Sequence, residues 1–209
     1  MRTFTRLSGI GAPLPGSNID TDQILPKQFL KVVERTGLAR ALFYDQRFDE
    51  GGAAKSGFVL NTPPYDKACI LVTGENFACG SSREHAVWAL IDFGIRCVIA
   101  PSFSEIFYSN SFNNGLLPIA LPVDTSRQLL QESHSAQPTF TVDLPAQTVT
   151  SPSGAVFGFT IDSNRKRTLM LGLDEIGSTL ERIAEIEAFE RQLDGLLDTC
   201  PRVSPLERS

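Results

Sequence analysis

The densest cluster of side chains that could take part in chemistry is one polar run. It reads Glu75-Asn76-Phe77-Ala78-Cys79-Gly80-Ser81-Ser82-Arg83-Glu84-His85. Gly80 allows the backbone to approach a ligand closely. A helix expected to start after Gly80 offers unpartnered N–H groups and the positive end of its dipole. Arg83 adds a planar guanidinium group that suits a carboxylate. We therefore interpret the run as an anion site for a carboxylate or a phosphate.

Each of these residues also has a purely structural interpretation. Ser81 and Glu84 have the spacing of a capping box, which predicts that Ser81 is a plain helix N-cap. Arg83 would then be a solvated helix residue. His85 is best explained as a structural histidine, because helical neighbours four positions apart seldom achieve the geometry of a Ser–His catalytic pair.

A second polar cluster, Asp20-Thr21-Asp22-Gln23, precedes it in the chain. Its two carboxylates resemble the start of a calcium loop, but the glycine and the distal glutamate of such a loop are missing. The simpler interpretation is an Asx-turn that ends a loop. The four cysteines contain no C-x-x-C spacing and the chain has only two histidines, so we expect no metal site on this chain.

The middle of the chain predicts the scaffold that positions the polar run. Three short apolar runs indicate buried strands, and helical patterns at 84–93 and 103–114 separate them. This order implies right-handed crossovers and a parallel sheet, with the polar run outside the carboxyl end of the first strand. Ser102 and Glu105 have the spacing of a second capping box. The predicted strands are Cys69–Val72, Cys97–Ala100 and Leu116–Leu121.

The flanking regions are less regular. The start of the chain predicts a short strand, Phe4–Leu7, followed by a loop rich in glycine and proline, and then a helix over residues 31–43. Antiparallel strands are expected at Thr139–Leu144, Gln147–Ser151 and Ala155–Thr160, and a helix at 174–193. We expect one domain over 1–195 and a flexible tail over 196–209.

Composition excludes several classes of protein. The chain has 209 residues, of which 42% are hydrophobic and 21% charged, and its formal net charge is −5. This charge argues against nucleic-acid binding and against a polybasic membrane anchor. No apolar run approaches the roughly 18 residues of a membrane span. The first residues lack the apolar stretch of a secretory signal. We therefore expect a cytoplasmic protein with reduced thiols.

Four segments together resemble the small-subunit family of 3-isopropylmalate dehydratases, in the aconitase superfamily. The resemblance covers about residues 1–195, and its segments occur in the family's order. Ala78 and Val87 depart from the family pattern, which usually has Gly and Pro there. Neither residue carries a reacting group. The segments are Asn18–Pro26, Cys79–Ala86, Ile106–Phe112 and Asn114–Ile119.

The resemblance implies an α/β fold, a swivelling β/β/α domain whose partly parallel central sheet is flanked by helices. It implies a hydro-lyase subunit that interconverts 2-isopropylmalate and 3-isopropylmalate in leucine biosynthesis. It also implies a large-subunit partner, on which a [4Fe–4S] cluster with one open iron is bound, and no cofactor on this chain. The substrate would be a small dicarboxylate.

Site residues follow from the same resemblance. Ser81 would be the catalytic base, and Asp22 a polar residue of the first loop that faces the site. Ser82 and Arg83 would orient a substrate carboxylate. A serine hydroxyl needs strong stabilisation of its alkoxide to act as a base, and the start of a helix can supply it.

Substrate preference is assigned to the segment after the first loop. Phe29 and Leu30 would contact an isopropyl group or, alternatively, belong to the core, whereas Lys31 would suit a third carboxylate. The alternative functions are a homoaconitase or related 2-hydroxy-acid hydro-lyase subunit, and a non-catalytic carboxylate-binding interaction domain.

Overall fold

The computed structural model describes residues 1–31, 34–81 and 83–197. It contains two compact units, Met1–Gly172 and Leu173–Ser209. The first unit ends earlier than residue 195, the domain boundary expected from the sequence. The single domain over 1–195 therefore stays a prediction. Of the tail expected over 196–209, residues 198–209 lie outside the described part of the chain.

A seven-stranded sheet forms the centre of the first unit, in the order β4-β3-β2-β1-β5-β6-β7. β1 to β4 pair in parallel, and β5 to β7 extend the sheet antiparallel from the other side of β1. The partly parallel α/β sheet expected from the sequence is thus confirmed. The strands are β1 (Arg6–Leu14), β2 (Ile70–Thr73), β3 (Cys97–Ala100), β4 (Leu117–Ala120), β5 (Thr139–Asp143), β6 (Thr148–Thr150) and β7 (Val156–Gly158).

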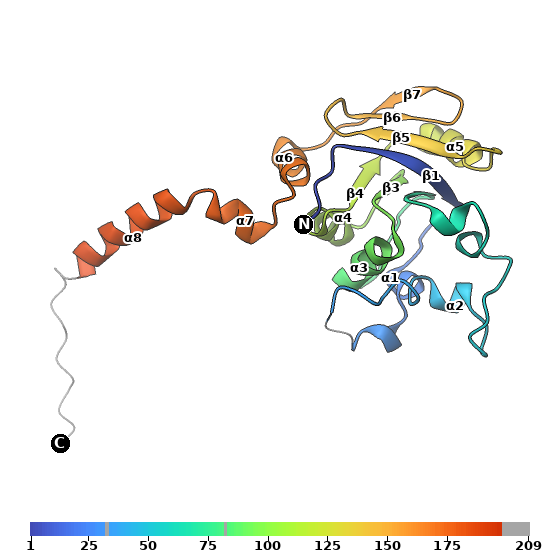
Figure 1. Cartoon of the computed structure of the whole chain (residues 1–209), viewed down its shortest axis with the longest axis horizontal. Coiled ribbons are helices and arrows are strands. Elements are labelled where there is room, and N and C mark those ends of the chain that lie inside the picture. The colour runs from blue at the N-terminus through green and yellow to red at the C-terminus, as the bar shows by residue number, and fades with distance from the viewer. Residues whose placement is uncertain (32–33, 82, 198–209) are drawn as a thin grey trace, which may run out of the picture. The chain divides into compact units, whose positions relative to one another are not determined.

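Helices cover the sheet and connect its strands (Figure 1). The two helices expected between the parallel strands, α3 and α4, are confirmed. Each ends at a glycine in the left-handed conformation, Gly94 or Gly115. The first unit contains α1 (Thr21–Ile24), α2 (Tyr44–Arg47), α3 (Glu84–Phe93), α4 (Glu105–Asn114), α5 (Val123–Glu132) and α6 (Ser163–Leu171), with the 3₁₀ turns η1 (Lys27–Phe29), η2 (Val59–Asn61) and η3 (Tyr65–Lys67).

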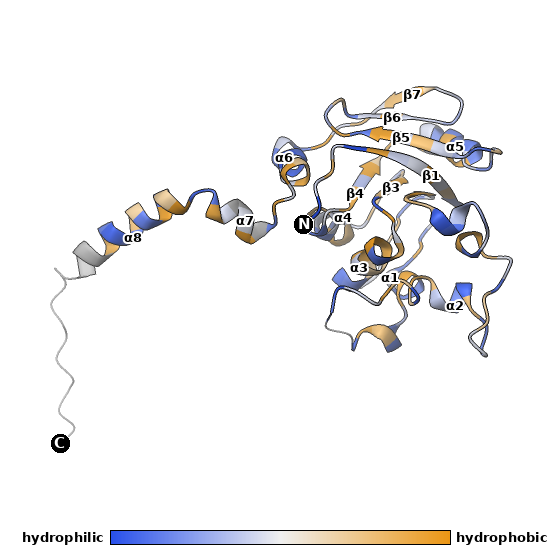
Figure 2. Cartoon of the chain, viewed as in Figure 1, coloured by the Kyte–Doolittle hydropathy of each residue, from blue (hydrophilic) through white to orange (hydrophobic). Residues whose placement is uncertain are grey.

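The core has two parts because successive side chains of a strand point to opposite faces. Leu71 of β2 belongs to one buried cluster together with residues of α1 and α3, whereas Ile70 and Val72 belong to another. The second cluster also includes Leu129 of α5 and Leu169 of α6. The apolar strands are therefore covered on both faces, as predicted, and appear hydrophobic in Figure 2.

The structure corrects the prediction at the start of the chain. The segment expected to be a loop after Leu7 continues as β1, which includes Gly9, Gly11 and Pro13. The glycines reflect close packing rather than turns: a Cβ on Gly9 would lie 2.4 Å from Cys69 Sγ, and one on Gly11 would lie 2.5 Å from Phe140 Cδ2. Pro13 is tolerated because β5 pairs with β1 only as far as Ile10.

Other helix predictions also need correction. The helix expected over 31–43 is not formed by the described residues of that range, and Gly37 within it has a φ of 85°. α5 and α6 were not predicted. In the second unit, the helix expected over 174–193 is divided into α7 (Glu175–Leu180) and α8 (Ile183–Leu197), and hydrophobic and hydrophilic residues alternate along α8 (Figure 2).

Candidate functional site

The two polar clusters found in the sequence are joined by backbone hydrogen bonds. Cys79 N donates to Ile19 O over 3.2 Å, and Thr21 N donates to Cys79 O over 2.9 Å. The Thr21 hydroxyl also donates to Ser81 O over 3.0 Å. These loops follow β1 and β2, which are adjacent and parallel, so their carboxyl ends meet at one edge of the sheet. Sequence reasoning missed this role of Thr21, although the residue lies inside a family segment.

The loop after β2 is held in an unusual backbone conformation. Asn76, Ala78 and Gly80 have φ values of 54°, 58° and 90°. Between them, Phe77 is fully buried, and its ring lies 5.4 Å from that of Phe107. Left-handed backbone costs an L-residue roughly 1–2 kcal/mol, so the family's usual glycine suits position 78 better than alanine. Ala78 keeps the conformation, and its carbonyl accepts a 2.6 Å hydrogen bond from Ser104 Oγ.

Ser81 lies before the helix rather than capping it. α3 begins at Glu84 with Arg83 as its N-cap residue, and no side chain caps it. Ser81 is exposed, and its hydroxyl has no hydrogen bond to any described residue. The capping-box prediction is therefore wrong. Glu84 does not complete a capping box with Ser81. Its Oε1 instead accepts a 2.8 Å hydrogen bond from Asn114 Nδ2.

The second capping box is wrong in the same way. α4 is capped by Ser104, whose hydroxyl accepts a hydrogen bond from Phe107 N. The Ser102 hydroxyl instead accepts a 2.9 Å hydrogen bond from Asn76 N, within the loop after β2. The spacing of residues in the sequence did not show which of two nearby serines, Ser102 or Ser104, caps the helix.

Arg83 pairs with Asp22 across the two loops. Its Nη1 donates to Asp22 Oδ1. The Arg83 side chain is 9% exposed, so it is not the solvated helix residue of the structural interpretation. The pKa of Asp22 is lowered, chiefly by the hydrogen bond from Arg83 and with smaller contributions from the charges of Arg83 and Lys27. Lys27 Nζ lies 3.8 Å from Asp22 Oδ2.

Asp20 has a local structural role. Its carboxylate accepts a 2.7 Å hydrogen bond from Gln23 N, and Gln23 Oε1 accepts one from Asp20 N. This is a complete capping box for α1, with Asp20 as N-cap. The Asp20 side chain therefore caps the start of a short helix rather than forming the Asx-turn expected at the end of the loop, and its carboxylate accepts from the backbone N–H of Gln23.

The remaining predicted site residues are placed as follows. Phe29 and Leu30 are partly buried and pack against the first core cluster, with the Phe29 ring 5.0 Å from that of Tyr44. This packing supports their interpretation as core residues. Lys31 is exposed. Ser82 lies outside the described residues. The His85 ring lies 4.5 Å from the Trp88 ring on α3.

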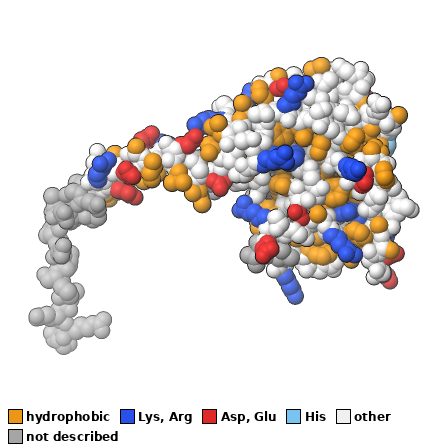
Figure 3. All heavy atoms as spheres, in the orientation of Figure 1, with side chains coloured by type: hydrophobic (Ala, Val, Ile, Leu, Met, Phe, Trp, Pro, Cys, Tyr) orange, Lys and Arg blue, Asp and Glu red, His pale blue; other side chains and the backbone are white. Residues whose placement is uncertain are grey.

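Metal-binding geometry is absent from the described residues, in which no group of three His, Cys, Asp or Glu side chains could hold an ion. Cys69, Cys79 and Cys97 are free thiols, and burial raises the pKa of Cys97 well above its usual value. Cys200 lies outside the described part. None of the described helices is long and apolar enough to cross a membrane. On the face in Figure 3, acidic and basic side chains are intermingled with apolar ones.

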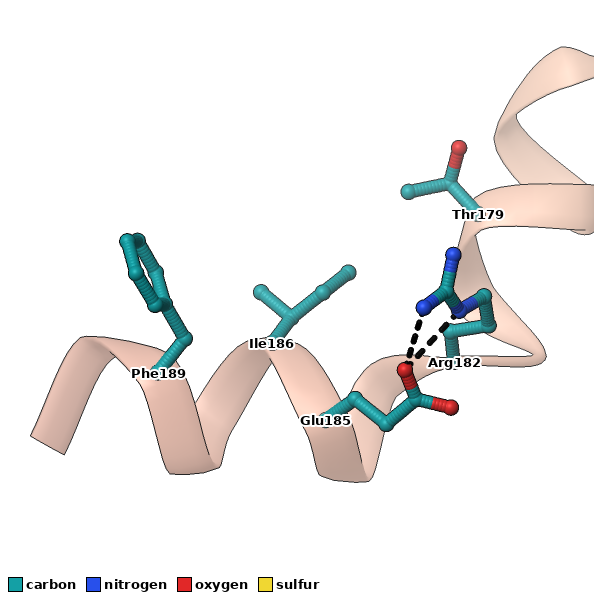
Figure 4. Close-up of a pocket in the computed structure, with 5 residues that line it drawn as sticks. All are labelled: Thr179, Arg182, Glu185, Ile186 and Phe189. Carbon is teal, nitrogen blue, oxygen red and sulfur yellow. Dashed lines mark hydrogen bonds and ion pairs between the residues drawn. The ribbon is translucent and has the colours of Figure 1, made fainter. Parts of the chain in front are cut away.

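The second unit contains an open groove of about 540 Å³ along α7 and α8 (Figure 4). Ile186 and Phe189 project from the same side of α8 beside it. Arg182 and Glu185, which also line the groove, form an ion pair with each other. The described lining therefore offers apolar contact and a neutralised charge pair rather than a set of groups suited to catalysis.

Comparisons with known proteins agree with the geometry. The family model described as the aconitase C-terminal domain matches residues 1–124, and the one described as LeuD_N matches residues 127–163. The 3-isopropylmalate dehydratase small subunit of Phenylobacterium zucineum is 60% identical over 190 residues, which are 91% of this chain and 94% of that protein. The subunit of the same name from Dinoroseobacter shibae is 56% identical over 193 residues, 92% of this chain and 96% of that protein.

A solved structure shows the same fold. The crystal structure of 3-isopropylmalate dehydratase (leuD) from Methanocaldococcus jannaschii matches with a TM-score of 0.64 and 26% sequence identity. The match covers 88% of this chain and 99% of that one. The swivelling α/β fold expected from the resemblance is thereby confirmed.

Proposed function

Since the chain belongs to the family of 3-isopropylmalate dehydratase small subunits, we propose that its contribution to the reaction comes from Ser81, Ser82, Arg83 and Asp22. The enzyme of this family is a hydro-lyase. It interconverts 2-isopropylmalate and 3-isopropylmalate by dehydration and rehydration in leucine biosynthesis.

Ser81 Oγ is the proposed base. It removes the proton from the carbon next to the one that loses hydroxyl, and returns a proton when water adds back. The observation that carries this assignment is that the Ser81 hydroxyl is exposed and unbonded among the described residues, just before the uncapped start of α3. To accept this proton Ser81 must be present as its alkoxide, and the positive end of the α3 dipole, which begins three residues further along the chain, would stabilise that charge.

Arg83 and Ser82 are the proposed ligands of a substrate carboxylate. Arg83 is held at the mouth of the site by Asp22, and one planar guanidinium group can contact two carboxylates through different N–H groups. Asp22 is therefore proposed to position Arg83, with its own carboxylate kept ionised by that contact. The assignment of Ser82 rests on the family resemblance alone.

The large subunit is the proposed site of the [4Fe–4S] cluster. Among the described residues, the three free thiols and their surroundings provide no ligand set for it. When bound on the partner, the cluster would supply a Lewis acid for the hydroxyl group that leaves. We accordingly propose that this chain works as the small subunit of a cytoplasmic heterodimer, active only with its partner.

Substrate preference is proposed to depend on Phe29, Leu30 and Lys31, which follow the Asp22 loop. Two of these side chains pack against the core, so they would act through a small exposed apolar surface. A homoaconitase or related hydro-lyase subunit would instead use Lys31 for an additional carboxylate.

Reconstitution tests the proposal. The full chain should show no dehydratase activity alone and should isomerise isopropylmalate when mixed with a cluster-loaded large subunit. Homocitrate should be converted much more slowly by the same pair. Turnover by the chain alone would contradict dependence on a partner, and a preference for homocitrate would assign the alternative hydro-lyase. Partner binding without any turnover would favour a non-catalytic domain.

A further inference from the structure

A second concave site lies in the first unit, between the start of the chain and the ends of two helices. Its volume is about 220 Å³. The lining combines three arginines with Trp88, Asn114, Gly115 and the apolar side chains of Met1 and Ile91. The arginines are Arg2, Arg35 and Arg96.

The described residues balance the positive charge in this cavity only in part. No ion pair joins Arg2, Arg35 or Arg96 to a carboxylate of a described residue. No acidic residue is among the described lining. One carboxylate lies beside the cavity, because Glu84 Oε1 accepts a 2.8 Å hydrogen bond from Asn114 Nδ2, and its single negative charge offsets only part of the three positive charges. Three cations around one cavity repel one another, and this protein carries a net negative charge elsewhere.

Arg96 is the most buried of the three. Its Nε is buried and has no hydrogen-bond partner, and its Nη2 reaches only the carbonyls of Arg2 and Thr3, each at 3.4 Å. Burial and the nearby charge of Arg2 lower the pKa of Arg96. A buried donor without a partner costs free energy, and the cost is greater for a charged group.

We propose that this cavity binds a small phosphate or carboxylate anion. Arginine presents several N–H groups in one plane and matches both oxyanions. Arg35 lies over the Trp88 ring at 5.4 Å, so its guanidinium is held at the rim by a cation–π contact. The volume is below the roughly 300–1,000 Å³ of pockets that enclose drug-sized ligands, which favours a small anion over a nucleotide.

This site is separate from the one assigned to the reaction. None of its lining residues is among those proposed to contact the isopropylmalate substrate, and Arg83 does not line it. Binding here and binding at Arg83 are therefore distinguishable by mutation.

Trp88 makes the proposal directly testable, because it is the single tryptophan of the chain. We would titrate the full chain with inorganic phosphate, and separately with succinate, at constant ionic strength kept by sodium chloride. The expected result is a saturable change in tryptophan fluorescence. The anion that binds more tightly identifies which of the two oxyanions the cavity prefers.

Matched variants assign the signal to the cavity. Arg96→Gln and Arg2→Gln should each raise the dissociation constant by about tenfold, the effect of losing one charge-assisted contact. Arg2 is exposed at the start of the chain, so Arg2→Gln decides the question if Arg96→Gln does not fold. Arg127→Gln, which alters an exposed arginine outside the cavity, should leave the titration unchanged. The proposal would be overturned by a fluorescence change that does not saturate. It would also be overturned if Arg2→Gln had the same dissociation constant as the native chain.

Discussion

Arg83 Nη1 donates a hydrogen bond to Asp22 Oδ1 and so connects two loops whose paired residues are 61 positions apart. The contact complements the backbone bonds between Ile19, Thr21 and Cys79, which join the same loops. Asp22 therefore influences the site by fixing the position of a nearly buried guanidinium group, while Ser81 beside it remains exposed.

Replacement of Asp22 by asparagine should change how stability depends on pH. The folded pKa of Asp22 lies below its usual 3.8 because of Arg83. The ion pair therefore stabilises the fold fully above the unfolded pKa, and its contribution is lost as the pH falls through the folded pKa. The carboxylate is 42% exposed, which limits the contribution to at most about 1 kcal/mol.

Chemical denaturation at several pH values measures this effect. The difference in free energy of unfolding between the native chain and Asp22→Asn should be constant from pH 7 to about pH 5 and should shrink below about pH 4. Asp66→Asn is the control, since Asp66 is exposed and its carboxylate makes no hydrogen bond or ion pair with a described residue. If the difference in free energy of unfolding between the native chain and Asp22→Asn grows as the pH falls, the ion pair between Asp22 and Arg83 does not stabilise the fold.

Arg83→Lys should weaken substrate binding in the reconstituted enzyme. Lysine keeps the charge but loses the planar arrangement of N–H groups that serves two carboxylates at once. We expect KM to rise by about tenfold with a smaller change in kcat. Steady-state kinetics with isopropylmalate provides the measurement, and Arg127→Lys, at an exposed ion pair with Asp124, is the control. An unchanged KM would remove Arg83 from the carboxylate ligands.

Ser81→Ala should abolish nearly all turnover. A group that acts only in the transition state affects kcat by several orders of magnitude and leaves KM nearly constant. Because the Ser81 hydroxyl makes no hydrogen bond to a described residue, its loss should not alter the midpoint of thermal unfolding. Ser56→Ala, at another exposed serine, serves as the control. If Ser81→Ala keeps native kcat, Ser81 is not the base.

Gly11→Ala should destabilise the fold. The added methyl group would lie 2.5 Å from the ring of the fully buried Phe140, and such overpacking costs about 1–3 kcal/mol. Gly57→Ala is a matched control because a Cβ there meets nothing within 4 Å. Thermal or chemical unfolding of the two variants checks the prediction. If Gly11→Ala and Gly57→Ala have the same free energy of unfolding, β1 and β5 can move apart at Gly11 without loss of stability.

The parallel strands and their connecting helices were predictable because their signals are local. Apolar runs such as Cys97–Ala100 indicate strands buried on both faces, and Gly94 and Gly115 end α3 and α4 where expected. The polar run was also located correctly outside the carboxyl end of β2. These features depend on residues close together in the sequence.

Errors occurred where a distant part of the chain decides the conformation. Gly9 and Gly11 resemble turn residues, but Cys69 and Phe140 are the reason that no larger side chain fits. Ser81 has capping-box spacing, yet the helix starts later because Ser81 O is bound by Thr21 from the other loop. The Arg83–Asp22 contact likewise could not be derived from either loop alone.

β1 pairs with β2 through its second half and with β5 through its first half. Ser8 meets Thr141, which follows it by 133 residues. On the ribosome, β1 therefore emerges early and must wait for most of the chain to be synthesised before its antiparallel neighbour exists. During that interval the unpaired edge of β1 is open to pairing with other nascent chains.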